Sequence, residues 1–188
     1  MPSEQQPTHL IFGFAPDRPA MVSVPPIEAR PDQPLPNCGP FLRVFAGVED
    51  ATTVLLRCAR EYIGLWRHVY EYGRRDSEHI NDQLSLLTWL IDREAGGHVE
   101  EIVVEAAAPT NPSSYGEMVA WLAWKYVLVA LGRGQSAHTD HDAALLERHI
   151  EAFDQLVDDV RAGVVRLPET ARNVFPPQTI RPPGGNPA

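Results

Sequence analysis

The longest apolar run of the chain covers residues 118–131 and contains one charged residue, Lys125. Its apolar positions lie on every side of a helix, and this pattern predicts a helix that other helices bury on most sides. The run is shorter than the about 20 apolar residues that a membrane-spanning helix needs. Ser114 is placed to cap the helix, and Glu117 three residues later completes a capping box. We therefore expect a central helix from about Ser114 to Leu131.

Apolar residues at helical spacing predict further helices on both sides of this one. The expected ranges are a short helix over residues 41–47 and longer ones over about 50–72, 77–95 and 139–162. Asp50 and Thr139 are the expected N-caps of the second and the last of these helices. Gly96-Gly97 is expected to end one helix in a left-handed turn, and Gly163 is expected to end the last. Residues 98–112 are compatible with a helical turn or a short extended piece.

The fold class that follows is all-α, and short connections favour a four-helix, largely antiparallel bundle. A helical domain over residues 41–168 is flanked by a proline-rich extended arm, residues 1–40, and a Pro/Gly-rich tail, residues 169–188. Ten of the 18 prolines lie in the arm, where they disfavour helix and sheet interior alike. The apolar stretch 10–14 is expected to dock as a short strand or against a neighbouring subunit. The alternative is a partly disordered tail.

The charge of the chain bears on its partners. The formal net charge is −9, and the longest run of basic residues is Arg74-Arg75. Nucleic-acid binding needs a basic patch that neutralises phosphates, and anionic membrane surfaces attract polybasic segments. We therefore expect neither nucleic acid nor a membrane as a partner.

The two cysteines, Cys38 and Cys58, form no CxxC pair and belong to no Cys/His cluster with zinc spacing. Cys58 is expected to be buried in a helix, whereas Cys38, in a Pro/Gly-rich segment, is expected to be exposed. The N-terminus lacks the charged-then-apolar pattern of a signal peptide. A reducing cytoplasm is therefore the expected location, and no disulfide is expected.

Sequence motifs for a cofactor or a metal are absent. The chain contains no GxGxxG or GxxxxGK[ST] phosphate loop, no GxSxG and no Glu-x-x-His. His138, Asp140, His141 and Asp142 near the start of the last helix are metal-ligand types, but acidic residues also suit a solvated helix start. We therefore predict no cofactor, no metal site and no identifiable catalytic set.

Five residues remain as candidates for ligand binding. Lys125 is the one charge of the apolar run, and Trp121 and Trp124 lie three residues apart on one face of the same helix. His149 falls on the apolar stripe of the last helix, and His68 lies among aromatic residues. Plainer interpretations are core packing for the tryptophans, hydrogen-bonded core positions for the histidines, and ion pairing or snorkelling for Lys125.

Short motifs resemble a domain-of-unknown-function family of small all-helical proteins that is common in high-GC Gram-positive bacteria. Residues 154–168 are similar to its C-terminal ending of acidic residues, glycine, basic residues and Leu-Pro. Ser114-Tyr-Gly116 resembles the end of its Thr-Glu-Thr-x-Gly element, and Ala120-Trp121 stands where the family has Asp-Arg. Residues 80–92 and 65–68 are similar to two further helical segments. The resemblance covers roughly residues 60–168 and implies an all-helical fold, no established activity, and an accessory role beside biosynthetic or surface-glycan genes.

The favoured hypothesis is a cytoplasmic, non-catalytic helical accessory protein that binds a protein partner or a second copy of itself. The alternative is a small-molecule- or metal-dependent biosynthetic enzyme with its site in the bundle core. An exposed apolar patch would support the first hypothesis. A cavity with convergent polar groups would support the second.

Overall fold

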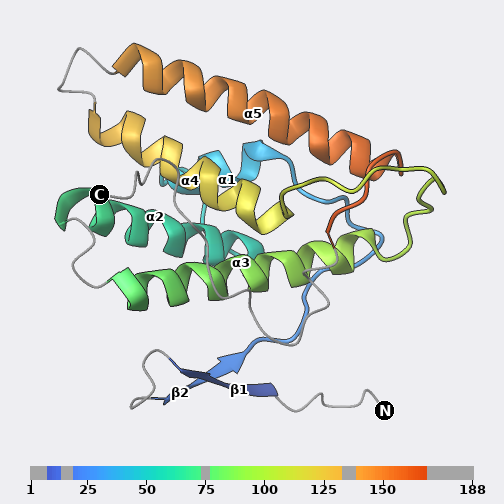
Figure 1. Cartoon of the computed structure of the whole chain (residues 1–188), viewed down its shortest axis with the longest axis horizontal. Helices are drawn as coiled ribbons and strands as arrows, with labels where there is room; N and C mark the ends of the chain where they lie inside the picture. Colours follow the sequence, from blue (N-terminus) through green and yellow to red (C-terminus); the bar gives the residue numbers. More distant parts are fainter. Residues whose placement is uncertain (1–7, 14–18, 73–76, 133–138, 169–188) are drawn as a thin grey trace.

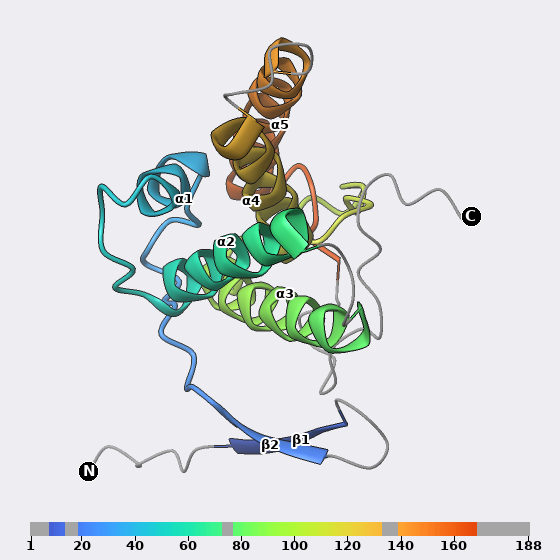
Figure 2. The same ribbon diagram turned by 90° about the vertical axis from the view of Figure 1, so that its left-hand side faces the viewer.

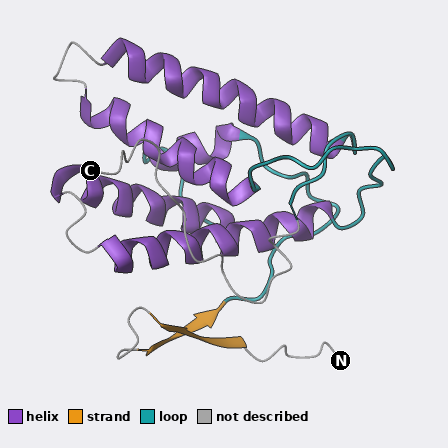
Figure 3. Ribbon diagram, viewed as in Figure 1, coloured by secondary structure: helices purple, strands orange, loops and turns teal. Residues whose placement is uncertain are grey.

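The computed structural model describes residues 8–13, 19–72, 77–132 and 139–168 of the 188-residue chain. Within these ranges the backbone forms a two-stranded sheet and five α-helices (Figures 1 and 3). In chain order they are β1 (Thr8–Gly13), β2 (Pro19–Val24), α1 (Cys38–Phe45), α2 (Val54–Tyr72), α3 (Ser77–Val99), α4 (Tyr115–Gly132) and α5 (Thr139–Arg161). The helical class expected for the main body of the chain is confirmed.

Helices α2, α3 and α4 form the centre of the fold, because each of them packs against the other two. Helix α5 packs against α4, and the short α1 contacts α2, α4 and α5. Figure 2 shows α5 above α4, with α2 and α3 on the opposite side of α4. These contacts do not establish a single four-helix bundle, because α1 shares the packing beside three of the long helices.

Helix α4 begins at the capping box that the sequence predicts. The Glu117 N–H donates to Ser114 Oγ at 3.1 Å, and the Ser114 N–H donates to Glu117 Oε2 at 2.8 Å. Every residue of α4 is buried or half-buried, as expected for a helix with neighbours on most sides. No helix in the described ranges has the length and apolar character to cross a membrane.

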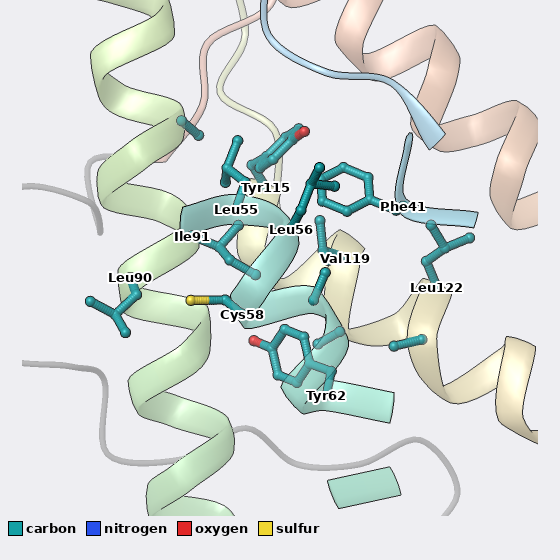
Figure 4. Close-up of a cluster of buried hydrophobic side chains, with 14 of the residues drawn as sticks. Phe41, Leu55, Leu56, Cys58, Tyr62, Leu90, Ile91, Tyr115, Val119 and Leu122 are labelled. Atoms are coloured by element: carbon teal, nitrogen blue, oxygen red, sulfur yellow. The ribbon is translucent and has the colours of Figure 1, made fainter. Parts of the chain in front are cut away.

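An aromatic cluster joins three helices in the core. The rings of Phe41 in α1, Tyr115 in α4 and Phe153 in α5 have centroids 5.1, 6.1 and 6.2 Å apart. All three side chains are fully buried, and Figure 4 shows Phe41 and Tyr115 among apolar side chains of the same core. Burial of an aromatic side chain contributes about 1.5–3 kcal/mol, so the short α1 is an integral part of the core.

The start of α2 differs from the sequence prediction, because Thr53 and not Asp50 precedes the first turn. The Leu56 N–H donates to Thr53 Oγ1 at 3.3 Å. The Val54 N–H donates to Glu28 Oε2 at 2.9 Å, and Glu28 lies 26 positions earlier in the sequence. A carboxylate from the arm therefore completes this helix start, which no local sequence pattern reveals.

The end of α3 also differs from the sequence prediction. The helix continues through Gly96 and Gly97 to Val99, and neither glycine has a positive φ. A Cβ on Gly97 would lie 3.0 Å from the Cβ of Ala29 and 3.1 Å from Cγ2 of Ile27. Gly97 therefore permits the arm to approach α3 closely and does not end the helix.

The end of α5 confirms its predicted stop. Gly163 has a φ of 73°, and its N–H donates to the carbonyl oxygen of Val160 at 3.0 Å. The Val164 N–H donates to the carbonyl oxygen of Asp159, also at 3.0 Å. This pair of bonds is a Schellman motif, which needs the left-handed conformation that glycine adopts without strain. Thr139, the expected N-cap, is the first residue of α5.

Residues 25–37 of the arm are docked on the helices. The N–H groups of Glu28 and Ala29 donate to Glu94 Oε2 at 3.0 and 2.9 Å. Arg161 Nη2, at the end of α5, donates to the carbonyl oxygen of Leu35 at 2.5 Å. The Leu35 side chain is buried in the core. The described end of the arm is thus part of the folded body.

The earlier part of the arm forms a hairpin, in which β1 and β2 pair in antiparallel fashion from Thr8↔Val24 to Gly13↔Pro19. Figures 1 and 2 show it to one side of the helices. β1 matches the strand expected at 10–14, of which residue 14 lies outside the described residues. β2 was not predicted, because proline disfavours a sheet interior, whereas both strands of a two-stranded sheet are edges. The expected tail, residues 169–188, lies outside the described residues.

Candidate functional site

Helices α4 and α5, which run side by side in Figures 1 and 2, bring Lys125 and His149 together. Lys125 Nζ lies 3.4 Å from His149 Nδ1. His149 Nε2 lies 2.8 Å from the carbonyl oxygen of Met118. A carbonyl oxygen only accepts, so Nε2 carries the hydrogen, and Nδ1 of the neutral ring presents its lone pair to Lys125. The lysine is therefore the donor of the pair and the histidine the acceptor.

Trp121, one turn before Lys125 in α4, adds an aromatic face to this pair. Lys125 Nζ lies 5.1 Å from the centroid of the Trp121 ring, within the range of a cation–π contact. Burial lowers the pKa of Lys125 below its ordinary value because the ammonium loses hydration. Burial also lowers the pKa of His149; the hydrogen bond to Met118 opposes this shift, and the charge of Lys125 adds to it.

The other two predicted candidates lie elsewhere. Trp124 packs against Trp66 of α2 with ring centroids 5.1 Å apart, and it belongs to the shell of side chains around the core. His68 is exposed on α2, with its ring 5.1 Å from that of Tyr72. The structure thus joins three of the five candidates and leaves these two outside the group.

A second candidate site lies beside the C-terminal half of α3, and we name it the α3 cleft. It has a volume of about 660 Å³. Its walls come from the arm, from residues 92–100 at the end of α3, from residues 102–110, and from α5 with the segment after it. The aliphatic lining residues are Ile27, Val99, Ile102, Val104, Val160, Val165 and Leu167.

Charged residues of both signs also line the α3 cleft. Arg93 Nη2 donates to the carbonyl oxygen of Pro25 at 2.9 Å. Arg166 Nη2 donates to the carbonyl oxygen of Glu105 at 2.9 Å. Asp92 is buried, and its Oδ1 accepts the backbone N–H of the second residue of α4 at 2.6 Å. The two arginine bonds join α3 to the arm and residue 166 to the segment 102–110, so the cleft is a preformed feature of the fold.

None of the five predicted candidates lines the α3 cleft. Its walls are far apart in sequence and meet through long-range contacts such as the parallel bridge between Thr110 and Arg166. The Arg166 N–H donates to the carbonyl oxygen of Pro109 at 2.9 Å, and the Asn111 N–H donates to that of Arg166 at 2.8 Å. The ambiguous pattern of residues 98–112 was the one sequence signal at this place.

Both cysteines are buried and free, so the expectation that Cys38 is exposed is wrong. Cys38 is the first residue of α1. Its N–H donates to Oδ1 of Asp154 in α5 at 2.8 Å. Burial raises the pKa of Cys58 to about 12. Burial, and then the nearby charge of Asp154, raise that of Cys38 well above its ordinary value. Neither thiol is therefore an activated nucleophile.

The polar group near the start of α5 shows no metal-site geometry in its described part. Asp140 and His141 are exposed and Asp142 is half-buried, while residue 138 lies outside the described ranges. Across the residues that the structure describes, no three or more His, Cys, Asp or Glu side chains are grouped to hold a metal ion.

Comparisons of the chain with protein-family models, with curated proteins and with solved structures find no match. Two groups of residues therefore remain as candidate sites, the Lys125–His149 pair with Trp121 and the α3 cleft. The first follows from sequence candidates, and the second follows from the fold alone.

Proposed function

We propose that this chain is a helical accessory protein that binds a polypeptide partner, and that the α3 cleft receives a short apolar segment of that partner. The volume of about 660 Å³ is within the range of sites that bury most of a ligand. Aliphatic side chains make up about half of the lining residues and give such a segment an apolar surface. Charged residues of both signs lie among them and can orient a peptide backbone.

The observation that carries this proposal is the exposed apolar surface that adjoins the α3 cleft. Ile27 lines the cleft and is 47% exposed, and Val103, which lies between two lining residues in the sequence, is 91% exposed. A small molecule held within the cleft would leave the Val103 side chain in water. A polypeptide covers a larger surface than a small molecule does, and exposed apolar surface is a mark of such interaction sites.

A distinct partner is favoured over a second copy on grounds of charge. Each chain carries a formal net charge of −9, so two copies repel each other at close range. Association between copies through the same cleft is a separate outcome of the experiment below.

The cytoplasm as location and an accessory role in a biosynthetic pathway belong to the same proposal. The two free, buried cysteines are compatible with a reducing compartment. The relationship to the helical family of unknown function is also proposed. Its support is the segment 114–116, where the family-like motif coincides with the capping box of α4.

The experiment is a search for peptides whose binding depends on the α3 cleft. A displayed random-peptide library is selected on the full chain, with counter-selection on a Thr110→Trp variant. Thr110 is an exposed lining residue, so an indole there obstructs the cleft at small cost to the core. Selected peptides are then titrated by fluorescence anisotropy. The matched control is Val48→Trp, which adds the same group at a position that is 76% exposed and does not line the cleft.

Binding is expected to weaken by about tenfold or more, or about 1.4 kcal/mol, in Thr110→Trp. Val103→Asp is expected to weaken it as well, and Val48→Trp is expected to leave it unchanged. The proposal is contradicted if the selection enriches no peptide that binds the wild type more tightly than Thr110→Trp. A concentration-dependent dimer in sedimentation equilibrium that Thr110→Trp abolishes would assign the cleft to a second copy.

The alternative function, an enzyme with its site between the helices, is favoured by one observation, the pair of Lys125 and His149. Its other expected members, Trp124 and His68, do not lie with this pair.

A further inference from the structure

Lys125 is the only lysine of the sequence, and all the other basic side chains apart from histidine are arginines. In the described residues the ion pairs are made by Arg43, Arg57 and Arg161, and Lys125 has no carboxylate partner there. Its Nζ instead faces an imidazole nitrogen and an aromatic ring. A guanidinium keeps its proton under all ordinary conditions, whereas a lysine amine with reduced hydration releases it readily. Lysine is therefore the one cationic side chain that could act as an amine at this position.

We propose that Lys125 is a nucleophilic amine that forms an imine with a planar aromatic aldehyde, and that His149 accepts the proton of its ammonium. Three contacts carry this inference: Lys125 to His149, His149 to Met118, and Lys125 to Trp121. The site does not share residues with the α3 cleft. It therefore goes beyond the partner-binding function and stands or falls independently of it.

His149 is oriented for the proton transfer by its second ring nitrogen. Nε2 donates to the carbonyl oxygen of Met118 at 2.8 Å, which directs the lone pair of Nδ1 towards Lys125 Nζ at 3.4 Å. A second proton on the ring would place two positive charges next to each other, so the ring rests in its neutral, accepting form. The lowered pKa of Lys125 favours release of its proton, and the lowered pKa of His149 favours the neutral resting ring.

Trp121 favours an aromatic aldehyde over an aliphatic one. Both Trp121 and Trp124 are half-buried, but only Trp124 belongs to the side chains that pack against the core. Its ring centroid lies 5.1 Å from the reacting nitrogen. A planar ring attached to the carbonyl carbon could therefore stack on the indole while that carbon reaches Nζ.

The reaction needs no oxidant or reductant. The Lys125 ammonium passes a proton to His149 Nδ1, and the free amine attacks the aldehyde carbon, forming the C–N bond. The carbonyl oxygen takes up the proton from His149 and a further proton from nitrogen. It then leaves as one water molecule when the C–O bond breaks and the C=N bond forms, and a protonated imine that keeps the third ammonium proton is left on Nζ.

The experiment compares Lys125 with an ordinary lysine in the same molecule. An Arg60→Lys variant of the full chain supplies that lysine, because position 60 is exposed on α2. The variant is treated at neutral pH with benzaldehyde and cyanoborohydride, and peptide mapping measures the reduced adduct at each amine over time. Propanal serves as the aliphatic comparison. Lys125→Arg, which retains a cation beside Trp121, is the control that should carry no adduct at position 125.

Lys125 is expected to react with benzaldehyde about tenfold faster or more than the lysine introduced at position 60. The ratio is expected to be smaller with propanal. Equal or slower labelling of Lys125 overturns the proposal, and an equal ratio for both aldehydes overturns the aromatic preference.

A His149→Gln substitution tests the proton acceptor. Its side-chain amide can still donate to the carbonyl oxygen of Met118, but it cannot take up a proton. The labelling rate at Lys125 is expected to fall about tenfold or more, while the rate at the introduced lysine stays the same. An unchanged ratio overturns the role of His149. If this substitution unfolds the chain, the comparison in the Arg60→Lys variant still decides the reactivity of Lys125.

Discussion

Gly116 of α4 lies directly against the backbone of Thr88 in α3. A Cβ at position 116 would be 2.4 Å from the carbonyl oxygen of Thr88 and 3.1 Å from Oδ1 of Asp92. The same Asp92 oxygen accepts the Gly116 N–H at 2.6 Å. A residue without a side chain is therefore required for the two helices to pack at this distance and to satisfy the buried carboxylate.

Gly116→Ala is expected to destabilise the fold by about 1–3 kcal/mol or more, because the added methyl group has to push α3 and α4 apart. Gly64→Ala is the matched control: position 64 is exposed on α2, and a Cβ there meets nothing within 4 Å. The control is expected to gain up to about 1 kcal/mol from the better helix propensity of alanine. Urea unfolding measures both changes. Equal stabilities of the two variants would refute the close contact.

Two hydroxyl groups on α3 should respond oppositely to removal. Ser85 Oγ is buried and has no hydrogen-bond partner among the described residues, so Ser85→Ala is expected to be neutral or stabilising by up to about 1 kcal/mol. Thr88 Oγ1 lies 2.5 Å from the Tyr62 hydroxyl and donates to the carbonyl oxygen of Leu84 at 2.9 Å. Thr88→Val keeps the shape and is expected to cost about 1–3 kcal/mol, because it leaves the buried Tyr62 hydroxyl with poorer bonding. Chemical denaturation of both variants provides the test.

The pH dependence of stability should report on His149. Its pKa in the folded chain is lowered below the ordinary 6.5, mainly by burial. At pH values between the pKa of the folded chain and 6.5, the unfolded chain therefore binds more protons than the folded chain does. The stability it contributes is therefore fully present above about 6.5 and is lost as the pH falls through that window. The slope of unfolding free energy against pH in this window is expected to be smaller in His149→Gln than in the wild type. A slope in His149→Gln equal to that of the wild type would refute the burial of His149.

Thiol reactivity should separate the folded from the unfolded chain. Burial raises the pKa of Cys58 to about 12 and that of Cys38 well above its ordinary value, so neither forms thiolate in mildly alkaline buffer. Both cysteines are expected to react with a disulfide reagent only after denaturant is added. The measurement is the absorbance of the released thiolate, with the denatured chain as the reference for two free thiols. Rapid reaction of either cysteine in the folded chain would show that its side chain is accessible.

Features encoded by neighbouring residues could be predicted from the sequence. The capping box of Ser114 and Glu117 and the stop at Gly163 depend on bonds that span three to five residues, so the pattern alone reveals them. The start of α2 and the end of α3 could not be predicted, because Glu28 accepts a bond from Val54 and Ala29 lies against Gly97, and both pairs are far apart in the sequence. The sequence alone does not distinguish a glycine that ends a helix from a glycine that permits another segment to pack closely against the helix.

The candidate site could be predicted only in part. The apolar run placed Lys125 in a buried helix, and the stripe of α5 placed His149 on an inward face. Their contact follows from the register between α4 and α5, which the sequence pattern leaves undetermined. The α3 cleft could not be predicted at all, because its walls meet only in the folded chain.

The bond between Arg161 and Leu35 can form only late in the synthesis of the chain. The two residues are 126 positions apart, and at about 5–20 residues per second a ribosome needs roughly 6–25 s to add that length of chain. Residues 25–37 therefore leave the ribosome long before α5, their last partner, exists. The proline-rich composition suits this interval, because a segment that is poor in amide donors and in helix-forming residues resists forming helix or sheet hydrogen bonds before α5 has been synthesised.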